Sequence, residues 1–272
     1  MRKKFKERIL RMKIVVCVKQ VPDTTEVRLD PVTNTLIRDG VPSIINPDDK
    51  AGIEAALTLK EKVGGTVTIV SMGPPQAEEA LREALAMGAD DAILISDRAF
   101  GGADTWATSS TIAAALKKLD YDLIITGRQA IDGDTAQVGP QIAEHLGIPQ
   151  ISYVEDIRVD GEALIVKRKF EDRSHMLKVK MPALLTALSE LNTPRYMTVK
   201  GVYKAYSKEI KVWGLEELKD TVDVADIGLK GSPTKVRKSF TKQAKGAGEK
   251  FNGSDDEAVA LIVKKLAEKH LI

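Results

Sequence analysis

Short apolar runs alternate with longer segments of helical periodicity along the first half of the chain. The apolar runs have the length of strands buried in a parallel sheet, and they cover residues 13–19, 66–71, 91–96 and 121–126. Between them, apolar positions recur at helical spacing, which predicts helices over residues 47–62, 76–86 and 105–119. Because this alternation favours right-handed crossovers, we expect an α/β fold with a mainly parallel sheet flanked by helices.

The pattern changes after Pro149. Runs rich in apolar and β-branched residues predict shorter, partly antiparallel strands over residues 151–156, 163–168, 176–179 and 183–188. Near the N-terminus, residues 20–25 are expected to form a loop, and residues 27–39 a small hairpin around Asp30-Pro31. We expect one α/β domain over residues 12–226, with its short antiparallel part after residue 150.

The two ends of the chain depart from this α/β pattern. Residues 1–11 are basic and lack the apolar core of a secretory signal, so we treat them as an N-terminal extension. Residues 227–254 are rich in Gly, Lys, Ser and Thr, which predicts an extended arm. This arm and the helix that follows it make up a C-terminal part over residues 227–272.

A capping box at Ser254 and Glu257 opens a final helix that reaches about His270. One face of this helix carries Val259, Ile262, Val263 and Leu266. A single helix beyond a long arm is marginally stable alone, so we expect it to pack on a partner subunit. Loose packing back onto its own chain is the alternative.

Composition narrows the possible functions. A net charge of +2 gives no support for binding to nucleic acid or to a membrane through bulk charge. The single cysteine, Cys17, excludes an intrachain disulfide framework and fits a reducing, cytoplasmic compartment. The three histidines lack the spacing of a metal site, so no metal is expected. We see no apolar run of membrane-spanning length.

The stretch over residues 122–140 is the strongest candidate for a binding site. A buried strand is followed by a polar loop, and a helical pattern begins near Val138. The free N–H groups and the positive dipole end of such a helix attract an anion. The stretch matches neither the usual dinucleotide fingerprint nor the P-loop. A nucleotide site is one interpretation, because such loops bind ligands in open α/β sheets; a plain strand-to-helix turn with a capping Asp is the other.

Individual residues of this loop suggest how a nucleotide could bind. Gly127 and Gly133 allow close approach, and Arg128 could pair with a phosphate. The backbone N–H groups near residues 133–138 could bind phosphates as well. Sugar hydroxyls or base edges could bond to the remaining polar side chains, which are Gln129, Asp132, Asp134, Thr135 and Gln137.

Several ordered motifs carry a family resemblance. They are VCVKQVPDT at 16–24, INPDDKAGIEAA at 45–56, VSMGP at 70–74, ALAMGAD at 84–90, GRQAIDGDTAQVGPQ at 127–141 and LNTPRYMTVKGVYKA at 191–205. From Met12 onward the chain resembles the small, or beta, subunit of electron-transfer flavoproteins. The region over residues 166–186 matches the family signature only loosely, because Arg173 and His175 stand where the pattern prefers acidic and Glu or Gln residues.

The resemblance implies a heterodimer. In this family the large, or alpha, subunit carries a flavin that exchanges electrons with a dehydrogenase, and the small subunit holds an adenine nucleotide in its α/β domain. The protein supplies position and electrostatics, so no catalytic side chain is expected. The nucleotide contacts that the resemblance places in this sequence are Cys17, Asn46, Pro47, Asp48, Asp49, Met72, Gly127, Arg128, Gln129, Ala130, Ile131, Asp132, Gly133, Asp134, Thr135, Ala136, Gln137 and Val138.

The identity of the nucleotide divides the family. Ordinary members bind AMP as a structural ligand. Bifurcating members bind a second FAD, which accepts electrons from NADH and splits them between ferredoxin or flavodoxin and the large-subunit flavin. The run GDTAQVGP at 133–140 is similar to the bifurcating group, so we expect FAD, with AMP as the alternative. A stand-alone adenine-nucleotide sensor is a second alternative.

The resemblance also predicts where the ligand and the partners lie. The adenine end is expected near Cys17, Asn46 and Met72. Residues 194–204 correspond to a recognition loop, which implies contact with an acyl-CoA-dehydrogenase-type or other flavin dehydrogenase. Residues from about 231 onward are expected to embrace the large subunit.

Overall fold

The structure is a computed structural model that describes residues 11–23, 42–237, 246 and 248–272. Its contacts divide the chain into a body that extends to Val236 and a C-terminal unit from Arg237 onward. The hairpin expected over residues 27–39 lies outside the described residues, as does almost all of the N-terminal extension.

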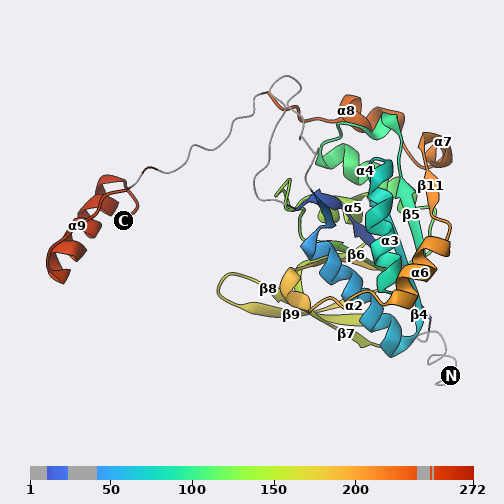
Figure 1. Ribbon diagram of the computed structural model, residues 1–272, viewed down its shortest axis with the longest axis horizontal. Helices are drawn as coiled ribbons and strands as arrows, with labels where there is room; N and C mark the ends of the chain where they lie inside the picture. The colour runs from blue at the N-terminus through green and yellow to red at the C-terminus, as the bar shows by residue number, and fades with distance from the viewer. Residues whose placement is uncertain (1–10, 24–41, 238–245, 247) are drawn as a thin grey trace. The chain divides into compact units, whose positions relative to one another are not determined.

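A parallel sheet forms the centre of the body (Figure 1). The four strands predicted in the first half pair in the order β5-β4-β1-β6, all parallel. Their apolar side chains are buried on both faces, which explains why they appear in the sequence as nearly continuous apolar runs. Their bounds are β1 (Met12–Val18), β4 (Gly65–Met72), β5 (Asp91–Ile95) and β6 (Leu123–Gly127).

Helices cover both faces of this sheet, so the predicted α/β fold is confirmed. On one face, Ile14 of β1 packs in a cluster with Ile53 and Leu81 of the covering helices. On the other face, Val15 packs in a cluster with Ile112 and its neighbours. The first face is covered by α2 (Pro47–Val63) and α3 (Glu78–Met87), and the second by α4 (Thr105–Leu116) and α5 (Val138–Leu146).

The strands after residue 150 extend the same sheet to the order β11-β5-β4-β1-β6-β10-β7-β8-β9. The antiparallel part predicted here consists of β7, β8 and β9. The fourth strand of this group, β10, is instead parallel to both of its neighbours. All five of its residues are buried, as a strand inside a parallel sheet requires. The bounds are β7 (Gln150–Asp160), β8 (Ala163–Lys169), β9 (Ser174–Lys180) and β10 (Ala183–Ala187).

Two other segments differ from the sequence-based expectation. The loop expected over residues 20–25 begins with β2 (Gln20–Pro22), which pairs antiparallel with β3 (Ser43–Ile45). Residues 227–236, expected to belong to the arm, are part of the body, where Ile227 and Ser232 are buried.

The remaining elements of the body are short. They connect the main strands and helices or, in the case of β11, add a parallel strand beside β5. Their bounds are η1 (Pro75–Ala77), η2 (Arg98–Phe100), η3 (Ser189–Leu191), α6 (Val199–Ser207), β11 (Lys211–Trp213), α7 (Leu215–Leu218), η4 (Val224–Asp226) and α8 (Gly228–Gly231).

Within its described residues, the C-terminal unit contains one helix, α9 (Asp255–Glu268). It opens with the predicted capping box, in which Ser254 and Glu257 bond to each other's backbone N–H groups. The apolar residues Val259, Ile262 and Val263 are exposed on it. Among the described residues, no helix is both long and apolar enough to cross a membrane.

Candidate functional site

The strand order places a crevice at the carboxyl ends of β1 and β6. From β1 the chain crosses to β4 on one side, whereas β6 lies on the other side of β1. At such a reversal of strand order, an open α/β sheet leaves room for a ligand. A cavity of about 90 Å³ lies there. It is lined by Cys17, Val18, Lys19, Asp49, Ile112, Thr126, Gly127, Arg128, Gln129, Thr135, Ala136, Gln137, Val138, Gly139 and Ile142.

Asn46 connects this crevice to the start of α2. The residue occupies the predicted N-cap position, but its side chain bonds to the loop that follows β6. Its Nδ2 donates to the Gln129 carbonyl oxygen at 2.8 Å, and its Oδ1 accepts from the Ile131 N–H at 3.1 Å. Two of the predicted stretches, 46–49 and 127–138, are therefore brought together.

Asp49 joins the ends of the two central strands. Its carboxylate accepts the backbone N–H of Lys19, just after β1, and that of Gly127, at the end of β6, each at 2.8 Å. Burial raises the pKa of Asp49 to about 7, against the opposing effect of these hydrogen bonds. The side chain thus fixes the width of the crevice and holds a proton more readily than an exposed acid does.

Asp48 extends the same arrangement to the next loop. Its Oδ1 accepts from the Ser189 N–H at 2.9 Å, and its Oδ2 lies 3.4 Å from Arg128 Nε. Burial raises the pKa of Asp48, and the Arg128 charge acts in the opposite direction. Pro47, between Asn46 and Asp48, is the first residue of α2.

Lys19 is a site residue that the sequence analysis missed. Its Nζ bonds to both carboxylate oxygens of Asp132 at 2.7 and 2.8 Å, and the Asp132 side chain is only 5% exposed. This pair ties the loop after β6 to the end of β1. Its partners are distant in sequence, so only the position of Lys19 directly after a buried strand could have suggested it. The other lining residues that were missed are Val18, Ile112, Thr126, Gly139 and Ile142.

The loop itself has an unusual backbone. Ala130 accepts the N–H groups of Gly133 and Asp134, which makes a tight turn. Asp134 and Ala136 then have φ values of 51° and 52°, a conformation that non-glycine residues rarely adopt and that is concentrated at binding sites. Gln137 returns to the right-handed region before α5. A left-handed to right-handed succession turns consecutive N–H groups toward one point, where an anion can bind.

Three predicted residues need separate comment. Cys17 lines the crevice and is buried, and burial raises the pKa of its thiol to about 12, which keeps the thiol neutral. Met72 lines a different cavity, of about 730 Å³, at the ends of β4 and β5. Ile131, in the middle of the loop, is exposed.

Gly133 and Gly127 differ in the space around them. The φ of Gly133 lies outside the left-handed region, and an added Cβ would meet nothing within 4 Å among the described residues. Gly127 is the crowded position, because a Cβ there would lie 2.2 Å from Asp49 Oδ1. The described residues also contain no group of three or more His, Cys, Asp or Glu residues placed to hold a metal ion.

Comparison with known proteins identifies relatives over nearly the whole chain. Residues 33–218 match the family described as Electron transfer flavoprotein domain. The chain is 62% identical over 261 residues to electron transfer flavoprotein subunit beta of Clostridium acetobutylicum. It is 54% identical over 264 residues to the caffeyl-CoA reductase-Etf complex subunit CarD of Acetobacterium woodii, and 52% identical over 268 residues to the acryloyl-CoA reductase electron transfer subunit gamma of Anaerotignum propionicum. Each comparison covers 96% of this chain and 100% of the relative.

Proposed function

This chain belongs to the electron transfer flavoprotein beta-subunit family, and on that premise we propose that it is the small subunit of a heterodimer and binds FAD in the crevice between β1 and β6. The single observation that carries this proposal is the loop after β6. It combines positive φ values at Asp134 and Ala136 with the N-terminus of α5, beside a crevice at the reversal of strand order.

The residues around the crevice suit the phosphates of a nucleotide. The N–H groups of residues 135–138 and the guanidinium of Arg128 would bind them, and the dipole of α5 favours the negative charge. Asn46 and the Lys19–Asp132 pair would hold the loop in place. Asp49 keeps the ends of the two strands at a fixed spacing.

A bound FAD would supply the redox chemistry: it would accept two electrons from NADH and pass one to ferredoxin or flavodoxin and one to the large-subunit flavin. The chain's own residues would bind and orient it. AMP is the second candidate, because its phosphate could bind to the same backbone N–H groups at the start of α5. A stand-alone nucleotide sensor would not need the exposed apolar face of α9.

An exposed apolar surface supports a contact with a dehydrogenase. Tyr196, Val199, Tyr203 and Tyr206 project from α6 and the segment that leads into it, and Val199 is 90% exposed. We define these four residues as the α6 surface. Exposed aromatic side chains at such density are typical of an interface. The partner we propose is an acyl-CoA-dehydrogenase-type flavoprotein.

The decisive experiment counts nucleotides in the heterodimer purified with its large subunit. We expect two FAD per heterodimer and flavin reduction by NADH in the same sample. One FAD and one AMP, with no reduction by NADH, would replace FAD by AMP at this site. Neither nucleotide in the small subunit would refute the site itself.

A further inference from the structure

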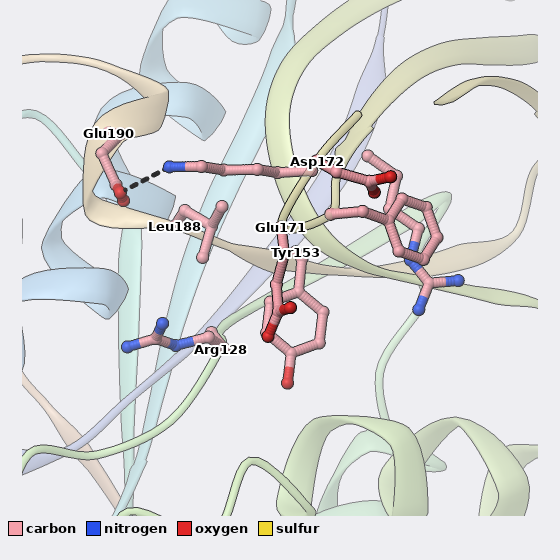
Figure 2. Close-up of a pocket in the computed structure, with 9 residues that line it drawn as sticks. Arg128, Tyr153, Glu171, Asp172, Leu188 and Glu190 are labelled. Carbon is pink, nitrogen blue, oxygen red and sulfur yellow. Dashed lines mark hydrogen bonds and ion pairs between the residues drawn. The ribbon is translucent and has the colours of Figure 1, made fainter. Parts of the chain in front are cut away.

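A cavity of about 590 Å³ lies between α6 and the turn that joins α3 to β5. Because β5 begins there, the cavity is at the amino ends of the parallel strands, whereas the crevice is at their carboxyl ends. The cavity in Figure 2 shares Arg128 with the crevice and belongs to that site. The cavity beside α6 shares no lining residue with either of them, and its volume is within the range of about 300–1,000 Å³ that small-molecule pockets have.

Helix α6 is fixed against α3 along one side of this cavity. A Cβ on Gly201 would lie 2.2 Å from the Ala86 carbonyl oxygen, so the two backbones are in close contact. Arg82 of α3 donates to the Ala205 carbonyl oxygen at 2.5 Å and to the Lys208 carbonyl oxygen at the end of α6. Side chains that project from α6 into the cavity therefore start from a fixed backbone, as a binding site requires. The floor between the two helices is apolar and buried, and it consists of Leu85, Ala86, Met87 and Ala205.

The rim of the cavity is basic. Among the described residues that line it, five carry a positive charge and only Asp90 carries a negative charge. Three of the five are spaced four residues apart, so they follow one another along α6. A concave surface with this excess of positive charge attracts anions. The five basic residues are Lys60, Arg195, Lys200, Lys204 and Lys208.

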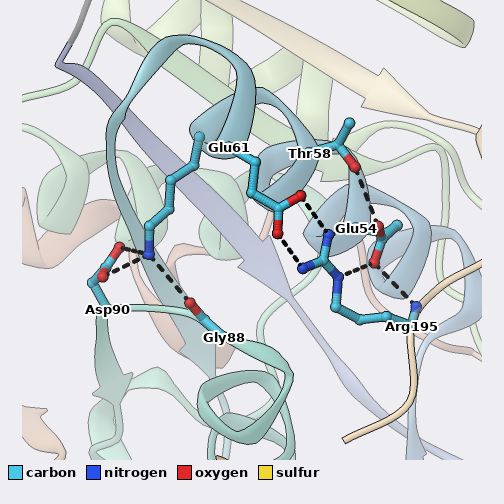
Figure 3. Close-up of polar contacts among 7 residues, drawn as sticks. Glu54, Thr58, Glu61, Gly88, Asp90 and Arg195 are labelled. Carbon is cyan, nitrogen blue, oxygen red and sulfur yellow. Dashed lines mark hydrogen bonds and ion pairs between the residues drawn. The ribbon is translucent and has the colours of Figure 1, made fainter.

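The charges of Lys60 and Arg195 are compensated within the protein (Figure 3). Lys60 Nζ bonds to the two carboxylate oxygens of Asp90 at 2.7 and 2.6 Å. Arg195 bonds to the Glu54 carboxylate at 2.8 and 2.9 Å and to Glu61 at 2.5 Å. These two basic residues therefore shape the wall of the cavity, and their charges do not need a further partner.

Lys200 and Lys204 are in a different situation. Lys208 lies 2.9 Å from an Asp91 oxygen, but Lys200 and Lys204 are exposed and have no ion-pair partner within the part of the chain that the structure describes. Lys200 is in the first turn of α6, where the helix dipole disfavours a cation. Lys204 is four residues further on, at the spacing where like charges repel. Local rules are broken in this way mainly at functional sites, and a bound anion would offset both effects.

We propose that this cavity binds a small anion with two linked phosphate groups. Lys200 and Lys204 would each meet one phosphate, because residues at this spacing have Cβ atoms about 5–6 Å apart on one side of a helix. An organic group attached to the phosphates would lie on the apolar floor beside Met87. The site is separate from the crevice, so it does not depend on which nucleotide the crevice holds.

Titration calorimetry on the full heterodimer, with its own nucleotides retained, tests the proposal. Pyrophosphate should bind with a dissociation constant below about 1 mM, and orthophosphate at least about tenfold more weakly, because it can meet only one lysine. Lys200→Gln and Lys204→Gln should each weaken pyrophosphate about fivefold. Lys180→Gln is the matched control, because Lys180 is an exposed lysine on β9, at the far edge of the sheet, and has no ion-pair partner among the described residues.

ADP distinguishes an organic diphosphate from the inorganic ion. Tighter binding of ADP than of pyrophosphate, lost in Lys200→Gln and Lys204→Gln, would support an organic ligand that uses the apolar floor. Equal affinities, lost in the same variants, would support the inorganic ion at the same site. The nucleotide content of the heterodimer, measured after each titration, shows whether ADP has entered the crevice instead.

Three results would overturn the proposal. Absence of saturable pyrophosphate binding up to about 10 mM would mean that the lysines form only a solvated face of α6. Equal weakening by Lys180→Gln would mean that the anion is attracted by the overall charge and not by this cavity. Unchanged affinity in both Lys200→Gln and Lys204→Gln would place the bound anion elsewhere on the heterodimer. Both lysines are exposed, so the denaturant midpoint of each variant should match that of the unaltered protein.

Discussion

Gly127, at the end of β6, and Gly133, in the loop that follows, differ in the space around them. A methyl group on Gly127 would lie 2.2 Å from Asp49 Oδ1 and 2.9 Å from its N–H nitrogen, inside the junction of β1 and β6. We expect Gly127→Ala to lower the free energy of unfolding by about 1–3 kcal/mol, because backbone must shift, and to empty the crevice. Denaturant unfolding and nucleotide content measure the two effects.

Gly133→Ala is the matched control for this prediction. Open space surrounds the position among the described residues, so the free energy of unfolding should stay within about 0.5 kcal/mol. Equal destabilisation by both variants would contradict the assignment of the crowded position. A loss of nucleotide from Gly133→Ala at unchanged stability would instead place the new methyl group against the ligand.

Asp49 makes the free energy of unfolding decrease as the pH rises, which is opposite to the usual effect of an aspartate. Its pKa is raised from 3.8 to about 7 in the folded chain. The folded state therefore holds the proton more tightly, and this contribution to stability is complete below pH 3.8 and is lost as the pH rises through 7.

Asp49→Asn provides the reference, because its side chain does not titrate. The free energy of unfolding of the unaltered protein minus that of Asp49→Asn should fall as the pH rises from about 4 to 7. The slope should be at most about 1.4 kcal/mol per pH unit, and the difference should be constant above pH 7. A constant difference over the whole range would mean that the carboxylate is ionised in the folded state.

At the scale of elements, the sequence predicted the strands that are buried on both faces. The runs at β1, β4, β5 and β6 are apolar throughout, so their pattern and their environment agree. Which of the strands after residue 150 are antiparallel was not predicted, and the parallel direction of β10 could not be, because a short apolar run carries no information about which strand lies beside it. The register slip of β7 around Tyr153 depends on pairing with β8 and β10, and local sequence does not encode it.

The sequence predicted where the candidate site lies better than it predicted the side-chain contacts within the site. The spacing of Asn46, Asp48 and Asp49 fits a helix start, and the helix does begin there. Their side chains form hydrogen bonds with the end of β6, with the loop that follows it and with Ser189. Helix-capping rules do not describe such tertiary contacts. The Lys19–Asp132 pair joins the ends of two strands, so it follows from the sheet order rather than from either sequence motif.

Helix α6 carries the prediction that concerns the dehydrogenase. Val199 is 90% exposed at the first position of this helix. Val199→Asp should therefore leave stability and nucleotide content unchanged while slowing transfer to an acyl-CoA dehydrogenase about tenfold, because an apolar contact would be replaced by a buried charge. Stopped-flow reduction of the dehydrogenase measures the rate. An unchanged rate would limit α6 to a structural role.

For the whole molecule, the body and the C-terminal unit depend on different contacts. The body has two apolar clusters that cover both faces of its sheet, and it extends to Val236. The C-terminal unit has one 14-residue helix, and none of its residues is buried within the described chain. A helix of this length is marginal in water without tertiary contacts. The proposed large subunit would supply those contacts to Val259, Ile262 and Val263.

Removal of residues 254–272 should therefore weaken the heterodimer without unfolding the body. We expect the dissociation constant for the large subunit to rise at least about tenfold, while the thermal midpoint of the separate small subunit changes little. Sedimentation and calorimetry measure the two quantities. Ile262→Glu should reproduce much of the effect, because it places a charge in the apolar face. Ala260→Glu adds the same charge beside that face and should not. If truncation and Ile262→Glu both leave the heterodimer intact, α9 does not hold the subunits together.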